Sequence, residues 1–400
     1  METSRRSFLG ALGSGLALAG GACAARRGAG DAPGALPQPT SSAGPVAVVR
    51  LGANENPYGP APSALRAVGA TLPEANRYAF SAMSDTGAAL AAHLHVPASH
   101  VVLGCGSSEI LEAAVAAFTS RDKGLVTAAP TFELPAERAA SNGAAVTDVR
   151  VDERGRLDLA AMLDRAPGSG LVYVCNPNNP TSTVHAATDI RAFIDNVHRR
   201  SPGTVVLVDE AYHEYVEAPA YASAAPLTVA EAGLIVTRTF SKIYGLAGLR
   251  VGCALGQPAT LARLRPWLGD LTMSVLTAAA AGASLADAAH VERQRALNHE
   301  ARAFTLEALA RAGCTAYESD ANFVMVDVAR DCRSFAAGCA ARGIRIARPF
   351  PPLEHHARIT IGTLDEMRRA TAVFAEVLAT PPAVTARWPG AVWSEDVRGC

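Results

Sequence analysis

Lysine is rare in this chain, so each lysine is informative. Only two occur in 400 residues, Lys123 and Lys242, although lysine and arginine together number 36. Lys242 closes the run Thr237–Lys242 and lies eight residues before Arg250. Arginine cannot replace a lysine that must lose its proton and attack a carbonyl carbon, because a guanidinium stays charged at any working pH. We therefore predict that Lys242 forms a Schiff base with a carbonyl compound.

A glycine-serine turn has the composition of a phosphate-binding site. In the run Gly104–Glu109, Gly106, Ser107 and Ser108 follow an apolar stretch and open a helical pattern. Backbone N–H groups at a helix N-terminus carry partial positive charge and attract a bound phosphate. Such turns are also common before helices that bind nothing, so this signal is weak when taken alone.

A second segment could neutralise the same phosphate. Arg250 lies in the run Gly248–Gly252, and its guanidinium could pair with a phosphate dianion. Glycines on both sides of the arginine would let the backbone approach the ligand closely. Ser241, next to Lys242, could donate a further hydrogen bond. The two segments together predict a phosphate site near Lys242.

Polar residues also follow two apolar, strand-like runs. Asp209 ends one such run and Tyr212 comes three residues later, while the segment Asn176–Thr181 follows the run 171–175. The carboxyl ends of strands in an open α/β sheet are where ligands bind. There Asp209 could keep a ring nitrogen protonated, and Tyr212 and Asn179 could hydrogen-bond a ring oxygen. The alternatives are a helix cap for Asp209 and ordinary Asn-Pro turns around Asn179.

One arginine near the C-terminal end suits a carboxylate. Arg358 begins the strand-like run Arg358–Gly362. A guanidinium binds a carboxylate through two parallel hydrogen bonds, so Arg358 is a candidate for a substrate carboxylate. The alternative is an ordinary exposed arginine at the edge of a sheet.

The segments that must position these residues alternate between two hydrophobic patterns, one typical of strands and one typical of helices. Continuous apolar runs typical of buried strands alternate with amphipathic helical patterns, which predicts an α/β fold with a mostly parallel sheet flanked by helices. A long helical stretch over 274–311 then leads to a smaller α+β domain. The expected strands lie at 124–128, 171–175, 204–208, 233–237, 251–255, 322–327 and 357–361, and the expected helices at 107–119, 157–165, 188–199, 331–342 and 364–378.

The order and placement of these motifs resemble the fold-type I pyridoxal-phosphate aminotransferases, and most closely the histidinol-phosphate aminotransferase branch. The resemblance extends over residues 46–378. Four further segments match motifs of that branch, namely Asn54–Gly59, Arg77-Tyr78, Pro130–Phe132 and Asn322-Phe323. The chain departs from three motifs of the family. The family's G-x-G-S-D-E corresponds to Gly104–Glu109, in which a serine replaces the aspartate, and its N-P-T-G corresponds to Asn179–Ser182, in which a serine replaces the last glycine. Its R-Y-P-D corresponds to Arg77–Phe80, in which alanine and phenylalanine replace the proline and the aspartate.

The resemblance implies pyridoxal 5′-phosphate as the cofactor and amino acids and 2-oxo acids as substrates, exchanged in a ping-pong reaction. It implies that Phe132 stacks on the cofactor ring and that Tyr78 reaches the phosphate of a neighbouring subunit, so we expect a homodimer. It adds Asn54 to the substrate site. The segment 345–352 resembles the stretch that carries a substrate-contacting arginine. We favour Arg348 for this role, although whether Arg345 or Arg348 points inward stays open.

The expected organisation has five parts. They are a signal peptide and disordered linker (1–45), an N-terminal arm (46–84), a large cofactor-binding domain (85–280), a small C-terminal domain (281–380) and an irregular tail (381–400). Arg5-Arg6 resembles a twin-arginine export signal, with cleavage after Ala24 or lipidation at Cys23 as possible processing. We therefore expect a periplasmic or exported protein. The alternative is a cytoplasmic protein whose signal does not function.

Charge, hydropathy and the expected export argue against three roles for this protein: nucleic-acid binding, membrane spanning and histidine biosynthesis. The formal net charge of −1 gives no field to attract nucleic acid. No run after the signal is long and apolar enough to span a membrane. Export also fits histidine biosynthesis poorly, because a phosphorylated intermediate of that pathway belongs to the cytoplasm.

Three other functions stay open at this stage. One is a decarboxylase, lyase or racemase of the same fold, and another is a non-catalytic protein that binds the cofactor. The third is an unrelated metalloenzyme using His93 and His95 or His355 and His356. No carboxylate or cysteine stands at ligand spacing to either histidine pair, so we predict no metal site.

Overall fold

The computed structural model describes residues 48–380. The expected signal peptide, the linker and the tail from residue 381 lie outside the described residues. The domain boundaries drawn from the sequence stay predictions. Between residues 48 and 380, no helix combines the length and the apolar character needed to cross a bilayer.

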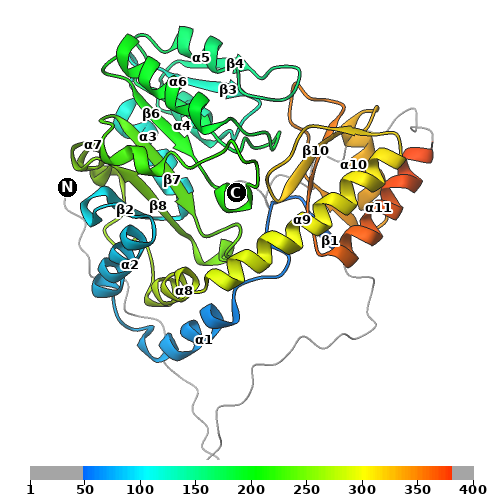
Figure 1. Ribbon diagram of the computed structural model, residues 1–400, viewed down its shortest axis with the longest axis horizontal. Helices are drawn as coiled ribbons and strands as arrows, with labels where there is room; N and C mark the ends of the chain where they lie inside the picture. Colours follow the sequence, from blue (N-terminus) through cyan, green and yellow to red (C-terminus); the bar gives the residue numbers. More distant parts are fainter. Residues whose placement is uncertain (1–47, 381–400) are drawn as a thin grey trace, which may run out of the picture. The chain divides into compact units, whose positions relative to one another are not determined.

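A large sheet forms the centre of the described chain (Figure 1). Strands β3 to β7 run parallel, and β8 is antiparallel to both of its neighbours. The predicted α/β class with a mostly parallel sheet is confirmed. Within residues 48–380 the sheet has seven strands, in the order β2 (Val101–Cys105), β8 (Val251–Gly256), β7 (Leu234–Thr239), β6 (Val205–Asp209), β5 (Leu171–Cys175), β3 (Leu125–Ala129) and β4 (Val146–Arg150).

Both faces of this sheet are buried, which explains the continuous apolar runs. In β5, Val172 and Val174 pack into one hydrophobic cluster, whereas Leu171 and Tyr173 pack into another. Successive side chains of a strand point to opposite faces, so the two clusters lie on the two sides of the sheet. β4, at one edge, lacks an apolar run and was not among the expected strands. β2, at the other edge, is also absent from the expected strands, although the apolar stretch that forms it was noted before the phosphate turn.

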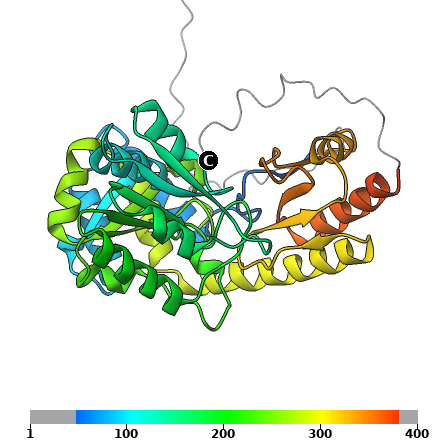
Figure 2. The same cartoon turned by 90° about the horizontal axis from the view of Figure 1, so that it is seen from above.

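Helices cover both faces of the large sheet and also the C-terminal region. The long helix α9 extends from the large-sheet part to the C-terminal part, where it packs against α11 (Figure 2). The helices are α1 (Pro62–Thr71), α2 (Phe80–His93), α3 (Gly106–Phe118), α4 (Leu134–Ser141), α5 (Leu159–Arg165), α6 (Ala187–Arg200), α7 (Pro258–Leu264), α8 (Val275–Leu285), α9 (Ala288–Arg311), α10 (Cys332–Ala340) and α11 (Leu364–Ala379).

The helical stretch expected over 274–311 is confirmed, and it consists of two helices, α8 and α9, separated at Ala286-Asp287. The side chain of Asp287 accepts a hydrogen bond from the backbone nitrogen of His290 at 3.1 Å and caps the start of α9. It also accepts a bond from the Ser63 hydroxyl at 2.6 Å. Aspartate favours such caps because its oxygen satisfies a free N–H group at a helix start. The apolar pattern alone did not reveal this break.

The C-terminal region contains a smaller α+β unit, as predicted. Strand β10 (Phe323–Asp327) lies between β9 (Thr315–Ala316) and β12 (His356–Thr360). The N-terminal strand β1 (Val49–Leu51) pairs in parallel with β11 (Ile344–Ile346). The start of the described chain is thereby anchored among its last elements.

A glycine in β8 lets the start of α3 approach the sheet. A Cβ added at Gly252 would overlap the backbone of Gly106 and Ser107. Gly106 itself has a φ of +76°, which L side chains rarely adopt. By contrast, a Cβ at Gly248 would meet nothing within 4 Å. Of the two glycines that flank Arg250, only Gly252 is therefore required for a close approach.

We expect Gly252→Ala to lower the free energy of unfolding by about 1–3 kcal/mol, because the added methyl overpacks the contact with the α3 turn. The matched change Gly248→Ala should alter it by less than about 0.5 kcal/mol. Chemical denaturation followed by circular dichroism measures both variants. Equal stabilities for the two variants would contradict the assigned role of Gly252.

Candidate active site

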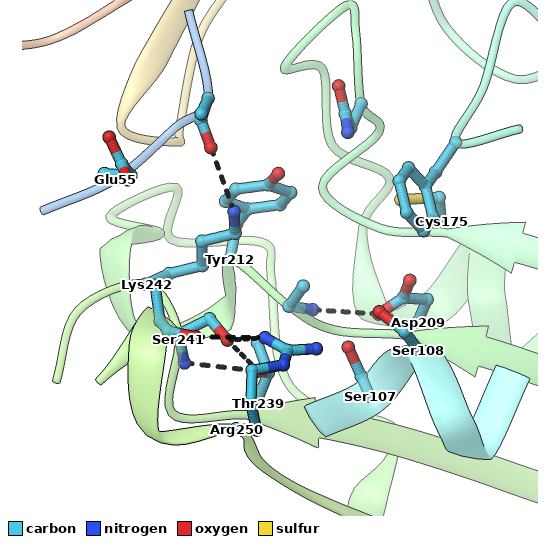
Figure 3. Close-up of a pocket in the computed structure, with 15 residues that line it drawn as sticks. Glu55, Ser107, Ser108, Cys175, Asp209, Tyr212, Thr239, Ser241, Lys242 and Arg250 are labelled. Atoms are coloured by element: carbon cyan, nitrogen blue, oxygen red, sulfur yellow. Dashed lines mark hydrogen bonds between the residues drawn. The ribbon is translucent and has the colours of Figure 1, made fainter. Parts of the chain in front are cut away.

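A pocket opens where several parallel strands end (Figure 3). Asp209 ends β6, Asn179 follows β5, and Lys242 follows β7. The pocket is lined by Ala53, Glu55, Ser107, Ser108, Phe132, Cys175, Asn179, Asp209, Ala211, Tyr212, Thr239, Ser241, Lys242, Ala247 and Arg250. The structure thus brings together eight residues predicted from the sequence besides Lys242 itself, from segments far apart in the chain.

Lys242 points into the pocket beside an aromatic ring. Its Nζ lies 5.5 Å from the centre of the Tyr212 ring and donates a hydrogen bond to the carbonyl oxygen of Ala53 at 3.3 Å (Figure 3). The side chain is half-buried. An amine in this position can meet a small aldehyde or amino compound that enters the pocket. The other lysine, Lys123, lies exposed on a loop and does not line the pocket.

Asp209 is a buried carboxylate with three donors. It accepts hydrogen bonds from the Tyr173 hydroxyl at 3.0 Å, the Thr237 hydroxyl at 3.1 Å and the Ala211 backbone nitrogen at 3.2 Å. Burial raises the pKa of the Asp209 carboxyl, and the bonds from Tyr173 and Thr237 act against that rise. A cationic ring nitrogen placed beside it would favour the ionised carboxylate. The site therefore suits a protonated heterocycle.

At another part of the pocket, positive charge gathers at the start of α3. Arg250, whose φ is 59°, donates hydrogen bonds to the Ser241 hydroxyl at 3.4 Å and to the Ala247 carbonyl at 3.1 Å. Its guanidinium occupies the space that a Cβ on Gly106 would need. Ser107 and Ser108 lie in the first turn of α3 and line the same pocket. A helix N-terminus, two hydroxyls and an arginine together form a phosphate cradle.

Tyr212 is held from behind the pocket by the N-terminal segment. Asn54 donates a hydrogen bond to the Tyr212 hydroxyl at 3.0 Å and is itself fixed by Thr360 and Asn322. Burial raises the pKa of the Tyr212 hydroxyl, so it stays protonated and can donate to an oxygen. Asn54 does not line the pocket, and its assignment to the substrate site stays a prediction.

Arg358 lies in β12, at the edge of the small sheet, but it is buried, which excludes the alternative of an ordinary exposed arginine. It donates hydrogen bonds to the Asn179 side-chain oxygen at 2.6 Å and to the Gly52 carbonyl at 2.5 Å. Because Asn179 accepts at its oxygen, its amide nitrogen is the donor that it can offer to a ligand. Arg358 thus stands behind the Asn179 wall of the pocket.

Besides Gly106, Asn54 and Arg358, two further predicted residues, Tyr78 and Arg348, do not line the pocket. Tyr78 is 77% exposed and packs near Phe80, and it is not among the residues that line the pocket of Lys242. Its action across a subunit interface stays a prediction. Arg348 forms an ion pair with Glu133 at the protein surface, and Arg345 is exposed in β11.

Several residues of the site were missed by sequence reasoning. Tyr173 and Thr237 orient Asp209, and Cys175, Thr239 and Glu55 line the pocket. The available signal was a polar side chain inside an otherwise apolar strand, as at Tyr173 and Thr237. Within residues 48–380, His, Cys, Asp and Glu side chains do not form groups of three or more that could hold a metal ion.

The chemistry of these residues fits pyridoxal 5′-phosphate. The Arg250 cradle suits its phosphate, the buried Asp209 carboxylate suits its ring nitrogen, and Lys242 suits its aldehyde. Phe132 and Tyr212 add aromatic surface to the same pocket. Each polar feature of the cofactor therefore has a side chain of matching chemistry in one pocket.

Comparison with known proteins identifies the family to which this chain is similar. Residues 46–374 match the family described as aminotransferase class I and II. The chain is 35% identical to a histidinol-phosphate aminotransferase of Symbiobacterium thermophilum, over 80% of this chain and 88% of that protein. It is 36% identical to an aromatic amino acid aminotransferase of Thermobifida fusca, over 79% and 87% respectively.

A solved structure agrees with these relatives. The histidinol-phosphate aminotransferase of Sinorhizobium meliloti, crystallised in complex with pyridoxal-5′-phosphate, superposes with a TM-score of 0.77 at 29% identity. The alignment covers 83% of this chain and 91% of that one. Since the family match extends over nearly all of the described residues, this chain belongs to the class I and II aminotransferases, which are enzymes that use pyridoxal 5′-phosphate.

Proposed function

We propose that this protein moves an amino group between an amino acid and a 2-oxo acid in two half-reactions at one site. The observation that carries the proposal is the position of the Lys242 amine in one pocket with Asp209 and Arg250. The relatives support a transaminase and differ from one another in their named substrates. The identity of the amino donor is therefore a question for direct measurement.

Bound pyridoxal phosphate would supply an electron-withdrawing ring that stabilises negative charge at the substrate α-carbon. The residues of this chain would hold that ring in place. Arg250, Ser107 and Ser108 would bind the phosphate, and Asp209 would keep the ring nitrogen protonated. Tyr212 and Asn179 would donate hydrogen bonds to the ring oxygen.

Lys242 and Arg358 have separate tasks in this proposal. Arg358 would hold the substrate α-carboxylate through paired hydrogen bonds. Lys242, acting as a neutral amine, would accept the proton from the substrate α-carbon. The neighbouring Tyr212 ring limits where the amine can go, because the lysine side chain extends beside it.

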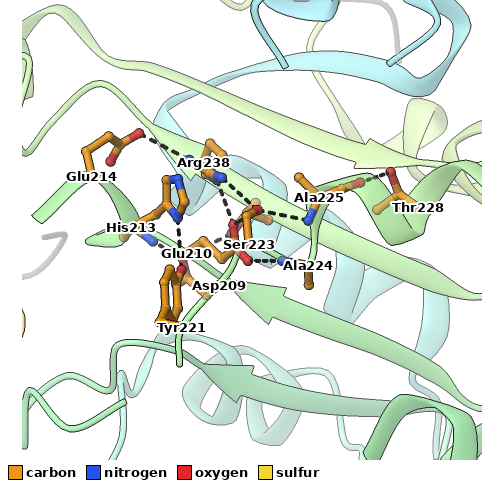
Figure 4. Close-up of polar contacts among 12 residues, drawn as sticks. Asp209, Glu210, His213, Glu214, Tyr221, Ser223, Ala224, Ala225, Thr228 and Arg238 are labelled. Atoms are coloured by element: carbon orange, nitrogen blue, oxygen red, sulfur yellow. Dashed lines mark hydrogen bonds and ion pairs between the residues drawn. The ribbon is translucent and has the colours of Figure 1, made fainter. Parts of the chain in front are cut away.

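A buried ionic network fixes the two segments that carry Asp209 and Lys242 (Figure 4). Arg238, in β7, donates to Glu210 at 2.8 Å and to Glu214 at 3.3 Å. It also donates to the Ser223 hydroxyl at 2.8 Å. Glu210 directly follows Asp209, and Arg238 lies four residues before Lys242. The network therefore holds the two segments in a fixed relation.

The dimer is a finer part of the proposal. Large apolar side chains are exposed along the N-terminal segment and near residue 270, namely Val48, Tyr58, Leu65, Leu72, Tyr78, Phe80, Trp267 and Leu271. Exposed apolar surface of this kind marks protein contacts. We propose that it meets a second copy of the chain and brings Tyr78 to the partner's phosphate cradle. Analytical ultracentrifugation showing a monomer would contradict this.

Export is also a proposal. The twin-arginine motif at Arg5-Arg6 lies outside the described residues and supports a periplasmic or exported enzyme. A protein that folds around its cofactor before export suits that route. Cell fractionation with and without an Arg5→Lys, Arg6→Lys double change tests it, and a wild-type protein confined to the cytoplasm would exclude it.

The purified protein with bound cofactor should lose its visible absorption band on addition of a suitable amino acid and release the matching 2-oxo acid. Lys242→Ala should abolish covalent attachment of the cofactor and reduce turnover at least about 1000-fold, because no other lysine among residues 48–380 lines the pocket. Lys123→Ala is the matched control and should behave as the wild type. Release of carbon dioxide or ammonia instead of a 2-oxo acid would exclude a transaminase.

Replacing Arg238 by Met should destabilise the fold by about 3–5 kcal/mol, because Glu210 and Glu214 would be left buried without their cation. Arg191 offers a control, since it is itself exposed, its partner Asp195 is exposed and its partner Glu231 is only half-buried. Arg191→Met should cost less than about 1 kcal/mol. Thermal unfolding of both variants measures the difference, and similar losses would argue against the network.

A further inference from the structure

Two ion pairs lie beside the pocket, and in each an arginine is already engaged by a glutamate. Arg50 pairs with Glu55, a pocket residue, at 2.9 Å. Arg348 pairs with Glu133, which directly follows the pocket residue Phe132. Glu133 belongs to the large-domain side and Arg348 to the C-terminal region, so the second pair bridges the two.

One aromatic ring connects this bridge to the arginine proposed to bind the substrate carboxylate. The guanidinium carbon of Arg348 lies 4.5 Å from the centre of the Phe350 ring, and that of Arg358 lies 4.7 Å from the same centre. Phe350 is buried, so the ring cannot move freely between them. Arg348 is therefore the next cation beyond Arg358 on this side of the pocket.

The charge of Arg348 is already compensated. A substrate whose side chain ends in a carboxylate or phosphate would need a second cation once Arg358 holds its α-carboxylate. To provide it, Arg348 would have to leave Glu133, and the released carboxylate would repel the incoming anion. A substrate with an uncharged side chain has neither cost. It would instead meet the apolar surface of Ala53, Phe132 and Tyr212.

We propose that Glu133 determines side-chain specificity. By competing for Arg348, it shifts selectivity toward amino acids with uncharged aromatic or aliphatic side chains and away from those bearing a carboxylate or phosphate. The proposal rests on the transaminase function for its substrate, and it adds a residue that the family motifs do not contain. Glu133 does not touch the reacting atoms, and it acts through Arg348.

The direct test is a binding measurement on the holoenzyme. Isothermal titration with glutarate and with its monoamide compares two ligands of the same shape that differ by one charge. Glu133→Gln should tighten the binding of glutarate relative to the monoamide by about tenfold, because Arg348 becomes available for a charge-assisted bond. Glu137→Gln removes the same charge one turn further along α4 and should leave the ratio at its wild-type value.

A second variant separates specificity from general damage. Arg348→Met should not improve glutarate binding, and adding Glu133→Gln to it should no longer change the ratio. The kcat/KM ratio for glutamate over glutamine should follow the same pattern. An unchanged glutarate ratio in Glu133→Gln, or an equal gain when Arg348 is absent, would overturn the proposal. Because binding is measured without turnover, failure of the transaminase function would show separately, as absent 2-oxo acid release.

Discussion

The site depends on keeping the carboxylate of Asp209 ionised where water is excluded. Burial disfavours a lone carboxylate, and here it raises the pKa of the Asp209 carboxyl. The three hydrogen bonds from Tyr173, Thr237 and Ala211 recover part of that cost, and a cationic ring nitrogen would recover more. The buried Asp209 carboxylate therefore favours a cationic partner such as the protonated ring nitrogen of the cofactor.

The sheet architecture explains why the charges gather at one edge. Strands β5 and β6 are buried on both faces, so polar side chains can meet a ligand only where these strands end. The strand register pairs Asp209 of β6 with Cys175 of β5 and with Thr237 of β7, so the three residues lie side by side on neighbouring strands. The same neighbourhood holds the buried network of Arg238, so structural and chemical charges are packed a few residues apart.

Sequence reasoning found what is local and missed what is distant in the chain. The strand runs and the helix after Gly106 could be predicted because apolar periodicity and turn residues act over a few positions. Lys242 and Arg250 stood out by type and spacing. The pairing of β1 with β11 and the ion pair of Arg348 with Glu133 depend on tertiary contacts that no local pattern encodes.

The N-terminal segment shows why these distant contacts matter for function. Gly52 and Ala53 offer adjacent carbonyls, one to Arg358 and the other to Lys242. Asn54 holds the Tyr212 hydroxyl, and its own carbonyl accepts from Asn322. A single stretch of backbone thus joins the substrate arginine, the reactive lysine and the ring-oxygen donor. Its anchor is β1 in the C-terminal region, so a shift of that region against the large sheet must alter the geometry around Lys242.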